Sequence, residues 1–122
     1  MDNFVSIRGA ISVKDNTITE IKKSVNELLN GIVQHNKLDT SKIINIIFTV
    51  THDLNAIHPA TVAREDSSFA NIPMLCTQEM KVPTDLPKCI RVMIQISSSL
   101  KRDEVKHIYL GEAAKLRPDL KI

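Results

Sequence analysis

The segment from Lys88 to Ser97 alternates between apolar and polar positions, and this pattern restricts the possible folds more than any other in the chain. Its branched aliphatic residues stand at every second position: Ile90, Val92, Ile94 and Ile96. The positions between them hold Arg91, Met93 and Gln95. Because successive side chains of a strand point to opposite faces, the segment is predicted to be a strand with one face in a core.

Four other segments are predicted to be strands of the same sheet. Residues Phe4 to Val13 alternate in the same way, with Arg8 on the polar side. Ile43 to Thr51 is apolar on both faces, which favours a position inside the sheet. Shorter strands are expected near Met74 to Met80 and over Lys106 to Leu110. Ile and Val together supply 25 residues and Trp none, a composition that favours sheet.

Helical segments separate these strands. Thr17 and Glu20 have the spacing of a capping box, and apolar residues at helical spacing then predict a helix to about Asn36. A second helix is expected from Pro59 to about Asp66, because proline suits the first turn of a helix. A capped turn is expected at Asp39 to Lys42 and a helical turn at Gly111 to Leu116. Arg117 to Asp119 is expected to be a mobile tail.

The order of these elements predicts one α+β domain over residues 1–122. At 122 residues and 13.7 kDa the chain is long enough for one modest core. The helices are expected to cover one face of a mixed sheet. The second face, which carries Arg8 and Arg91, then needs either solvent or a partner subunit, and we favour the partner subunit.

Composition and spacing argue against several kinds of site. The chain has only three glycines, so it contains no glycine-rich loop that could bind phosphate. Cys76 and Cys89 stand 13 positions apart and the four histidines are dispersed, so no metal site is expected. No local pattern activates a nucleophile, and a net charge of +2 with few aromatic residues argues against nucleic-acid binding. Two cysteines, no targeting segment and no long apolar run indicate a cytoplasmic protein without a membrane span.

Two of the five arginines, Arg8 and Arg91, fall in the middle of predicted strands. Such an arginine either faces solvent, pairs with an acid, or lines a pocket that binds carboxylates through paired hydrogen bonds. Glu79 is likewise either a surface carboxylate or the partner of one of these arginines. The residues by themselves leave these alternatives open.

Four stretches of the chain, taken together, resemble one family. They are Ile7-Arg8-Gly9-Ala10, Cys76-Thr77-Gln78-Glu79-Met80, Cys89-Ile90-Arg91-Val92-Met93, and His107-Ile108-Tyr109-Leu110 with Leu116-Arg117-Pro118-Asp119-Leu120. In this order and spacing they are similar to the monofunctional chorismate mutases of the AroH class, which are small trimeric bacterial enzymes. The similarity covers nearly the whole chain, including Asp53-Leu54 and Ala63-Arg64-Glu65.

The resemblance implies the [3,3] rearrangement of chorismate to prephenate, on the way to phenylalanine and tyrosine, with no cofactor. It also implies a pseudo-α/β-barrel homotrimer with active sites at the subunit interfaces. The rearrangement is intramolecular and needs no proton transfer. The enzyme therefore has to hold a flexible dianion in its compact form and stabilise negative charge that grows on the ether oxygen.

The resemblance also implies which residues carry the reaction. Arg91 is expected to bind the ether oxygen and a neighbouring carboxylate. Glu79 is expected to accept a hydrogen bond from the ring hydroxyl. Arg8 and Tyr109 are expected to hold carboxylate groups, with Tyr109 donating its phenolic hydrogen.

Further residues are implied to bind the substrate. Strand parity places Cys76 and Glu79 on opposite faces, so Cys76 is expected to contribute its backbone N–H rather than its thiol. Arg64 and Arg117 are expected at the mouth of the site, where they attract the dianion, and Leu116 is expected to help close it. Arg117 is expected to become ordered when ligand binds.

Two positions depart from the family pattern. His58 stands where an aromatic residue usually precedes Pro-Ala, and Thr61 stands where a lysine is common. Both positions are expected to affect substrate affinity, and protonated His58 would supply part of the missing positive charge below about pH 6.5. The alternative function is a non-catalytic or deaminase-like trimer that binds small carboxylates at its subunit interfaces.

Overall fold

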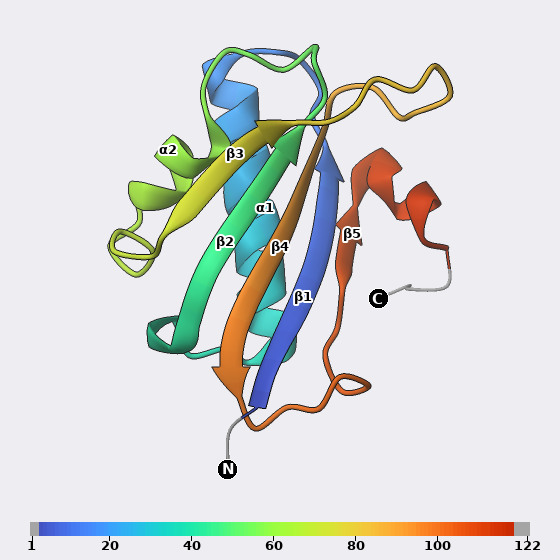
Figure 1. Ribbon diagram of the computed structural model, residues 1–122. Coiled ribbons are helices and arrows are strands. Elements are labelled where there is room, and N and C mark those ends of the chain that lie inside the picture. Colours follow the sequence, from blue (N-terminus) through green and yellow to red (C-terminus); the bar gives the residue numbers. More distant parts are fainter. Residues whose placement is uncertain (1–2, 119–122) are drawn as a thin grey trace.

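The structure, a computed structural model, describes residues 3–118, which form a five-stranded mixed sheet covered by helices (Figure 1). In chain order the elements are β1 (Asn3–Ser12), α1 (Ile18–Asn36), the 3₁₀ turn η1 (Thr40–Lys42), β2 (Ile43–Val50), α2 (Pro59–Arg64), β3 (Met74–Gln78), β4 (Cys89–Ser98), β5 (Ile108–Leu110) and the 3₁₀ turn η2 (Gly111–Leu116). The predicted α+β class and the predicted order of elements are confirmed. The last two residues of the resembling stretch, Asp119 and Leu120, lie outside the described residues.

The strands lie in the order β3-β2-β4-β1-β5. The central strand β4 runs antiparallel to β1 and β2, whereas β3 is parallel to β2 and β5 is parallel to β1. The predicted interior position of β2 is therefore confirmed, because it is hydrogen-bonded on both sides. β3 and β5 are the edge strands, so they lie at opposite edges of the sheet.

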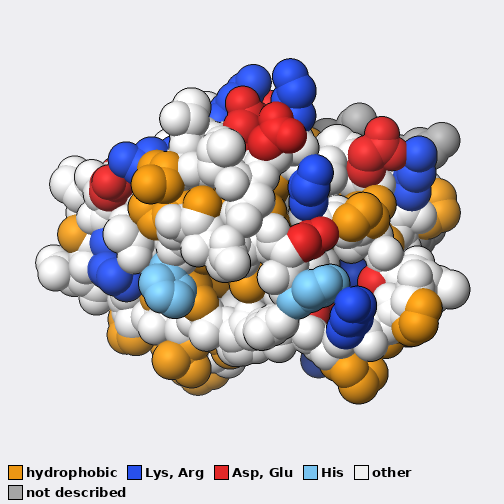
Figure 2. Space-filling view, turned by 90° about the horizontal axis from the view of Figure 1, so that it is seen from above, with side chains coloured by type: hydrophobic (Ala, Val, Ile, Leu, Met, Phe, Trp, Pro, Cys, Tyr) orange, Lys and Arg blue, Asp and Glu red, His pale blue; other side chains and the backbone are white. Residues whose placement is uncertain are grey.

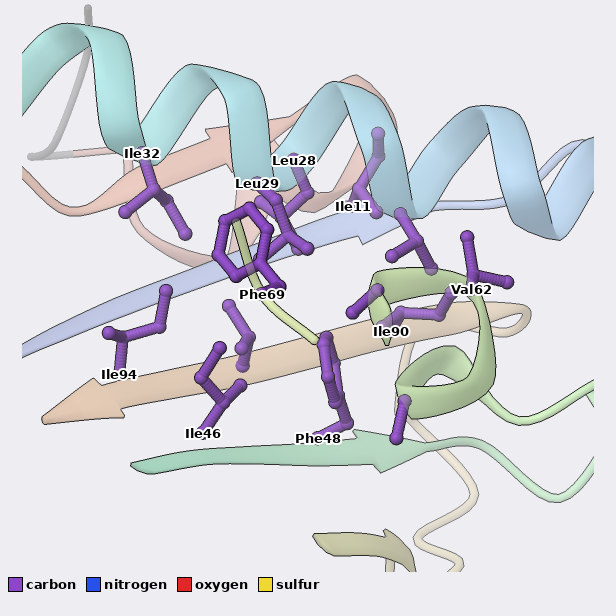
Figure 3. Packing of buried hydrophobic residues seen from close by; sticks show 14 of the residues in the cluster. Ile11, Leu28, Leu29, Ile32, Ile46, Phe48, Val62, Phe69, Ile90 and Ile94 are labelled. Carbon is purple, nitrogen blue, oxygen red and sulfur yellow. The ribbon is translucent and has the colours of Figure 1, made fainter. Parts of the chain in front are cut away.

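One core lies between α1 and the sheet, with α2 packed at its side (Figure 3). The inward residues of β4 are those expected from the alternation, and Ile90, Ile94 and Ile96 are almost completely buried. Phe48 of β2 is buried among them. Each fully buried aliphatic side chain stabilises the fold by about 1.5–3 kcal/mol. None of the helices within residues 3–118 is long and apolar enough to cross a membrane.

The first helix begins where the capping pattern predicts. The Thr17 side-chain oxygen accepts a hydrogen bond from the Glu20 backbone N–H at 3.2 Å. The N–H of Thr17 itself donates to the carbonyl of Asp15, so the reciprocal half of a capping box is replaced by a backbone bond. At the other end Lys37 adopts a left-handed conformation with φ 51° and ends the helix.

The face of the sheet opposite α1 is largely open and carries apolar as well as charged side chains. Phe4 is 74% exposed and Leu75 is 66% exposed, and Ile47 and Met93 are also exposed. Arg8 shares this face because it pairs with Met93 across β1 and β4. An exposed set of large apolar side chains of this kind is typical of an interaction surface.

Candidate active site

Ala10 occupies the centre of a row of three residues across the open face. It pairs with Arg91 of β4 on one side and with Tyr109 of β5 on the other. Residues paired across strands point to the same face, so the guanidinium and the phenol flank a methyl group. Arg8 lies two positions earlier on β1 and shares this face. The sheet therefore brings together three of the four residues that the resemblance marks as catalytic.

Glu79, the fourth of them, reaches the same row from the end of β3. Its backbone N–H donates to the Val50 carbonyl at 2.9 Å, which extends the β2–β3 pairing by one residue. Its Oε1 atom lies 3.0 Å from Arg91 Nε, so the expected partnership with an arginine is present. Burial raises the pKa of Glu79, and the Arg91 charge offsets part of that increase.

The ion pair leaves hydrogen-bonding capacity unused. Within the described part of the chain, Glu79 Oε2, Arg91 Nε and Thr49 Oγ1 are buried atoms without a well-aligned hydrogen bond. Thr49 pairs with Arg91 across β2 and β4. Buried polar groups are normally satisfied, so a polar ligand or ordered water is expected to bind at this cluster.

The η2 turn covers the end of the row beyond Tyr109. Ala113 packs on Ala10 and Cys89, and Leu116 is in contact with the same cluster. The turn is anchored by Ser12, whose side-chain oxygen accepts a hydrogen bond from the Glu112 N–H at 2.9 Å. Burial raises the pKa of Cys89 to about 11, so this thiol stays protonated and is no nucleophile at neutral pH.

A second group of expected site residues gathers around α2. His58 is the N-cap of this helix, and Thr61 and Arg64 lie within it. The Ala60 N–H donates to Cys76 Sγ at 3.4 Å, which joins the start of α2 to β3. His58 and Cys76 line a groove of about 590 Å³.

Cys76 lies as strand parity predicts. Its thiol is turned toward α2 and the core, and burial raises its pKa, whereas Glu79 faces Arg91. Parallel pairing uses the backbone groups of every second residue, and here the Pro73 carbonyl and the Glu79 N–H are bonded to β2. The N–H of Cys76 therefore points outward from the free edge of β3.

The expected site residues thus form two groups in one chain. The arginine group consists of Arg8, Glu79, Arg91, Tyr109, Leu116 and Arg117. The α2 group consists of His58, Thr61, Arg64 and Cys76. Figure 2 looks onto the end of the molecule where β1, β2 and β3 end, and it shows acidic, basic and histidine side chains interspersed there. Glu79, Arg8 and the pair His58 and Cys76 line three different grooves of the chain.

Two supporting features were not assigned roles by the sequence reasoning. Asp53 accepts the Lys88 N–H with both carboxylate oxygens, and Thr51 accepts the Cys89 N–H, so these side chains hold the start of β4. A threonine and an aspartate spaced two apart directly after a buried strand are the signal that could have indicated this. His107 accepts a hydrogen bond from the Arg8 N–H, a contact that no local pattern reveals.

The comparisons with known proteins show the family to which the chain is similar. The family model described as "Chorismate mutase type I" matches residues 4–120. The chain is 37% identical over 116 residues to the chorismate mutase AroH of Bacillus subtilis, covering 95% of this chain and 91% of that protein. It is 39% identical over 115 residues to the chorismate mutase AroH of Thermus thermophilus, covering 93% of each. The structure of a chorismate mutase from Clostridium thermocellum matches with a TM-score of 0.86 and 41% identity, covering 90% of this chain and 97% of that one.

Proposed function

The chain belongs to the type I chorismate mutase family and is therefore an isomerase, and we propose that it converts chorismate to prephenate at a site completed between subunits. The observation that carries the proposal is the Arg91–Glu79 pair on the open face, because the partly exposed guanidinium suits an anion and the buried Oε2 of Glu79 suits a hydroxyl group of the same ligand. One domain over residues 1–122 contains every residue type that the shared site needs. The family match over residues 4–120 supports that assignment.

The rearrangement breaks one C–O bond and forms one C–C bond within the same molecule. Arg91 stabilises the negative charge that grows on the ether oxygen, since its guanidinium stays charged and can donate two hydrogen bonds in one plane. Glu79 orients that guanidinium through its Oε1 atom and accepts the ring hydroxyl with Oε2. No proton has to leave the substrate, so neither residue acts as an acid or a base.

The other residues of the arginine group bind the carboxylates of the substrate. Tyr109 and Arg8 flank Ala10 along the open face, where their donors hold the two carboxylates and favour the compact form of the substrate. Leu116 closes the pocket from η2, and Arg117 follows it at the mouth.

The α2 group completes the site from a neighbouring subunit of a homotrimer. The Cys76 side chain is turned toward α2 and the core, whereas Glu79 and Arg91 lie on the open face, which supports a site built by two chains rather than one. The exposed Phe4, Leu75 and Met93 supply apolar surface for that contact. Arg64 attracts the dianion, the Cys76 N–H is a free donor at the edge of β3, and His58 and Thr61 line the entrance.

We place the reaction in the cytoplasm. Both cysteines are free, and a free thiol persists most readily in a reducing compartment.

The first experiment follows the loss of chorismate absorbance with purified protein in buffer containing EDTA, and confirms prephenate as the product. Sedimentation equilibrium on the same sample measures the number of subunits. Rapid loss by a trimer is expected. A folded trimer that binds chorismate without converting it would instead indicate a carboxylate-binding protein, and an active monomer would contradict the shared site.

A further inference from the structure

His107 and Arg8 are joined by an unusual hydrogen bond at the edge of the sheet. The backbone N–H of Arg8 donates to Nδ1 of the His107 ring at 2.9 Å. The bond lies directly before the point where β1 and β5 begin to pair, at Gly9 and Ile108. If the parallel ladder continued by one more step, the Arg8 N–H would donate to the Lys106 carbonyl instead.

Asn36, the last residue of α1, binds the backbone of Lys106 and so keeps it from pairing with β1. The Asn36 side-chain oxygen accepts the Lys106 N–H at 2.7 Å, and its amide nitrogen donates to the Lys106 carbonyl at 2.9 Å. The same nitrogen donates to the Ile32 carbonyl at 3.0 Å, so both donors and the acceptor of this buried side chain are used. Asn36 thus ends the ladder and leaves the Arg8 N–H to the imidazole.

The ring is held in the state that this bond needs. Partial burial lowers the pKa of His107, and the charges of Arg8 and Arg117 lower it further. Lys101 and Arg102 line the same groove as Arg8 and His107, so the surrounding charge is positive. A neutral imidazole with its proton on Nε2 keeps the Nδ1 lone pair available as an acceptor.

We propose that His107, supported by Asn36, is a positioning residue that fixes the backbone of Arg8 and so aims its guanidinium at a substrate carboxylate. The inference rests on the proposed function of Arg8 in binding that carboxylate. Binding a carboxylate through a guanidinium requires a defined geometry, so a displacement of the Arg8 backbone moves its donors away from the position at which they hold the substrate. The expected loss on removing the bond is therefore in substrate affinity, not in the rearrangement step.

The test compares two variants of nearly the same shape. His107→Asn places an oxygen at the same distance along the side chain as Nδ1, whereas His107→Leu removes the acceptor. His107→Leu is expected to raise KM for chorismate about 3- to 10-fold with kcat nearly unchanged, since a hydrogen bond of this kind has a modest net effect. His107→Asn is expected to keep the parent KM. Equal KM values for the two variants would overturn the proposal.

A double-mutant cycle with Arg8→Ala separates positioning from general structure. In the Arg8→Ala background, His107→Leu is expected to cause no further increase in KM. Additive increases would show that the ring does not act through Arg8. If Arg8→Ala itself left KM unchanged, the proposed role of Arg8 would fail; if only His107→Leu left it unchanged, the positioning role alone would fail.

Circular dichroism checks that each variant is folded. If His107→Leu does not fold, His107→Gln takes its place, because its carbonyl lies one bond farther along the side chain and misses the Nδ1 position. The proposal then predicts that His107→Gln raises KM and that His107→Asn does not. A KM that rises in His107→Asn but not in His107→Gln would overturn it.

Discussion

Glu79 contacts Arg91 through only one of its two carboxylate oxygens. Oε1 lies 3.0 Å from Arg91 Nε, whereas Oε2 is buried without a well-aligned hydrogen bond to any residue within 3–118. The Glu79 side chain is 16% exposed and that of Arg91 is 40% exposed. The carboxylate therefore holds the guanidinium from the buried side, while the guanidinium remains accessible to a ligand on the open face.

This geometry predicts that Arg91 is the most sensitive position in the site. Arg91→Ala is expected to lower kcat/KM by at least ~10²-fold, the usual loss when one preorganised donor is removed from a developing charge. Arg91→Lys keeps the charge but loses the planar pair of donors, so a large loss is expected there too. Steady-state kinetics measures both, and near-normal turnover by Arg91→Ala would contradict the electrostatic mechanism.

Arg64 is expected to behave differently, because it lies exposed at the end of α2, away from the arginine group. Arg64→Ala should raise KM with little change in kcat, and the difference from the parent should shrink as salt screens the attraction of the dianion. Arg64→Lys is the matched control, since it keeps the charge and should keep most of the affinity. A comparable fall in kcat would place Arg64 beside the reacting atoms instead.

Turnover should depend little on pH in the neutral range. Burial raises the pKa of Glu79, so acid protonates this carboxylate sooner than an exposed one and removes the acceptor for the ring hydroxyl. Between about pH 6 and 9 no group that the mechanism uses has to transfer a proton, so kcat should be nearly constant. The pH profile of kcat is the measurement, and a bell-shaped curve within that range would indicate acid–base catalysis.

The local patterns were sufficient to predict the strands and their faces. The alternation around Arg91 predicted both the buried isoleucines and the open face, because a strand has a period of two whatever lies next to it. The parity argument for Cys76 and Glu79 succeeded for the same reason. The roles assigned to individual site residues came from the resemblance to a family, and they stay predictions.

Contacts between distant segments could not be predicted in this way. The bond from Arg8 to His107 and the bonds from Asn36 to Lys106 join residues 99 and 70 positions apart. They depend on which strand lies at the edge and where its pairing stops, and a single sequence carries no signal for either. The separation of the site into two groups likewise follows from strand order, not from residue spacing.

Asp53 is predicted to stabilise the loop that leads into β4. Burial raises its pKa, but the hydrogen bonds from Thr51 and the Lys88 N–H outweigh that effect and lower it. A carboxyl whose pKa is lowered on folding adds stability above its unfolded pKa of about 3.9, and this contribution is lost as the pH falls through the folded pKa. Asp53→Asn should therefore lower Tm at pH 7, with a difference from the parent that narrows below about pH 4.

Asp39→Asn provides the control for that experiment. Asp39 caps the exposed η1 turn, where its carboxylate accepts hydrogen bonds from the backbone N–H and the hydroxyl of Ser41, far in sequence from the loop before β4. Its substitution should change Tm less than Asp53→Asn does. Thermal unfolding of the three proteins from pH 3 to 7 gives the comparison, and an Asp53→Asn difference that grows in acid would contradict the assigned sign.

Gly9 and Gly31 are predicted to respond in opposite ways to the same substitution. A Cβ on Gly9 would lie 2.8 Å from the Ile108 carbonyl oxygen, which belongs to the paired backbone of β5 and cannot move aside cheaply. A Cβ on Gly31 would meet two side chains at ordinary contact distances, Ile108 at 3.4 Å and Leu110 at 3.9 Å. Gly9→Ala should destabilise the fold by about 1–3 kcal/mol through overpacking, whereas Gly31→Ala should stabilise α1 by about 0.5–1 kcal/mol. Chemical denaturation measures both, and a stable Gly9→Ala protein would show that β5 is free to shift away from β1.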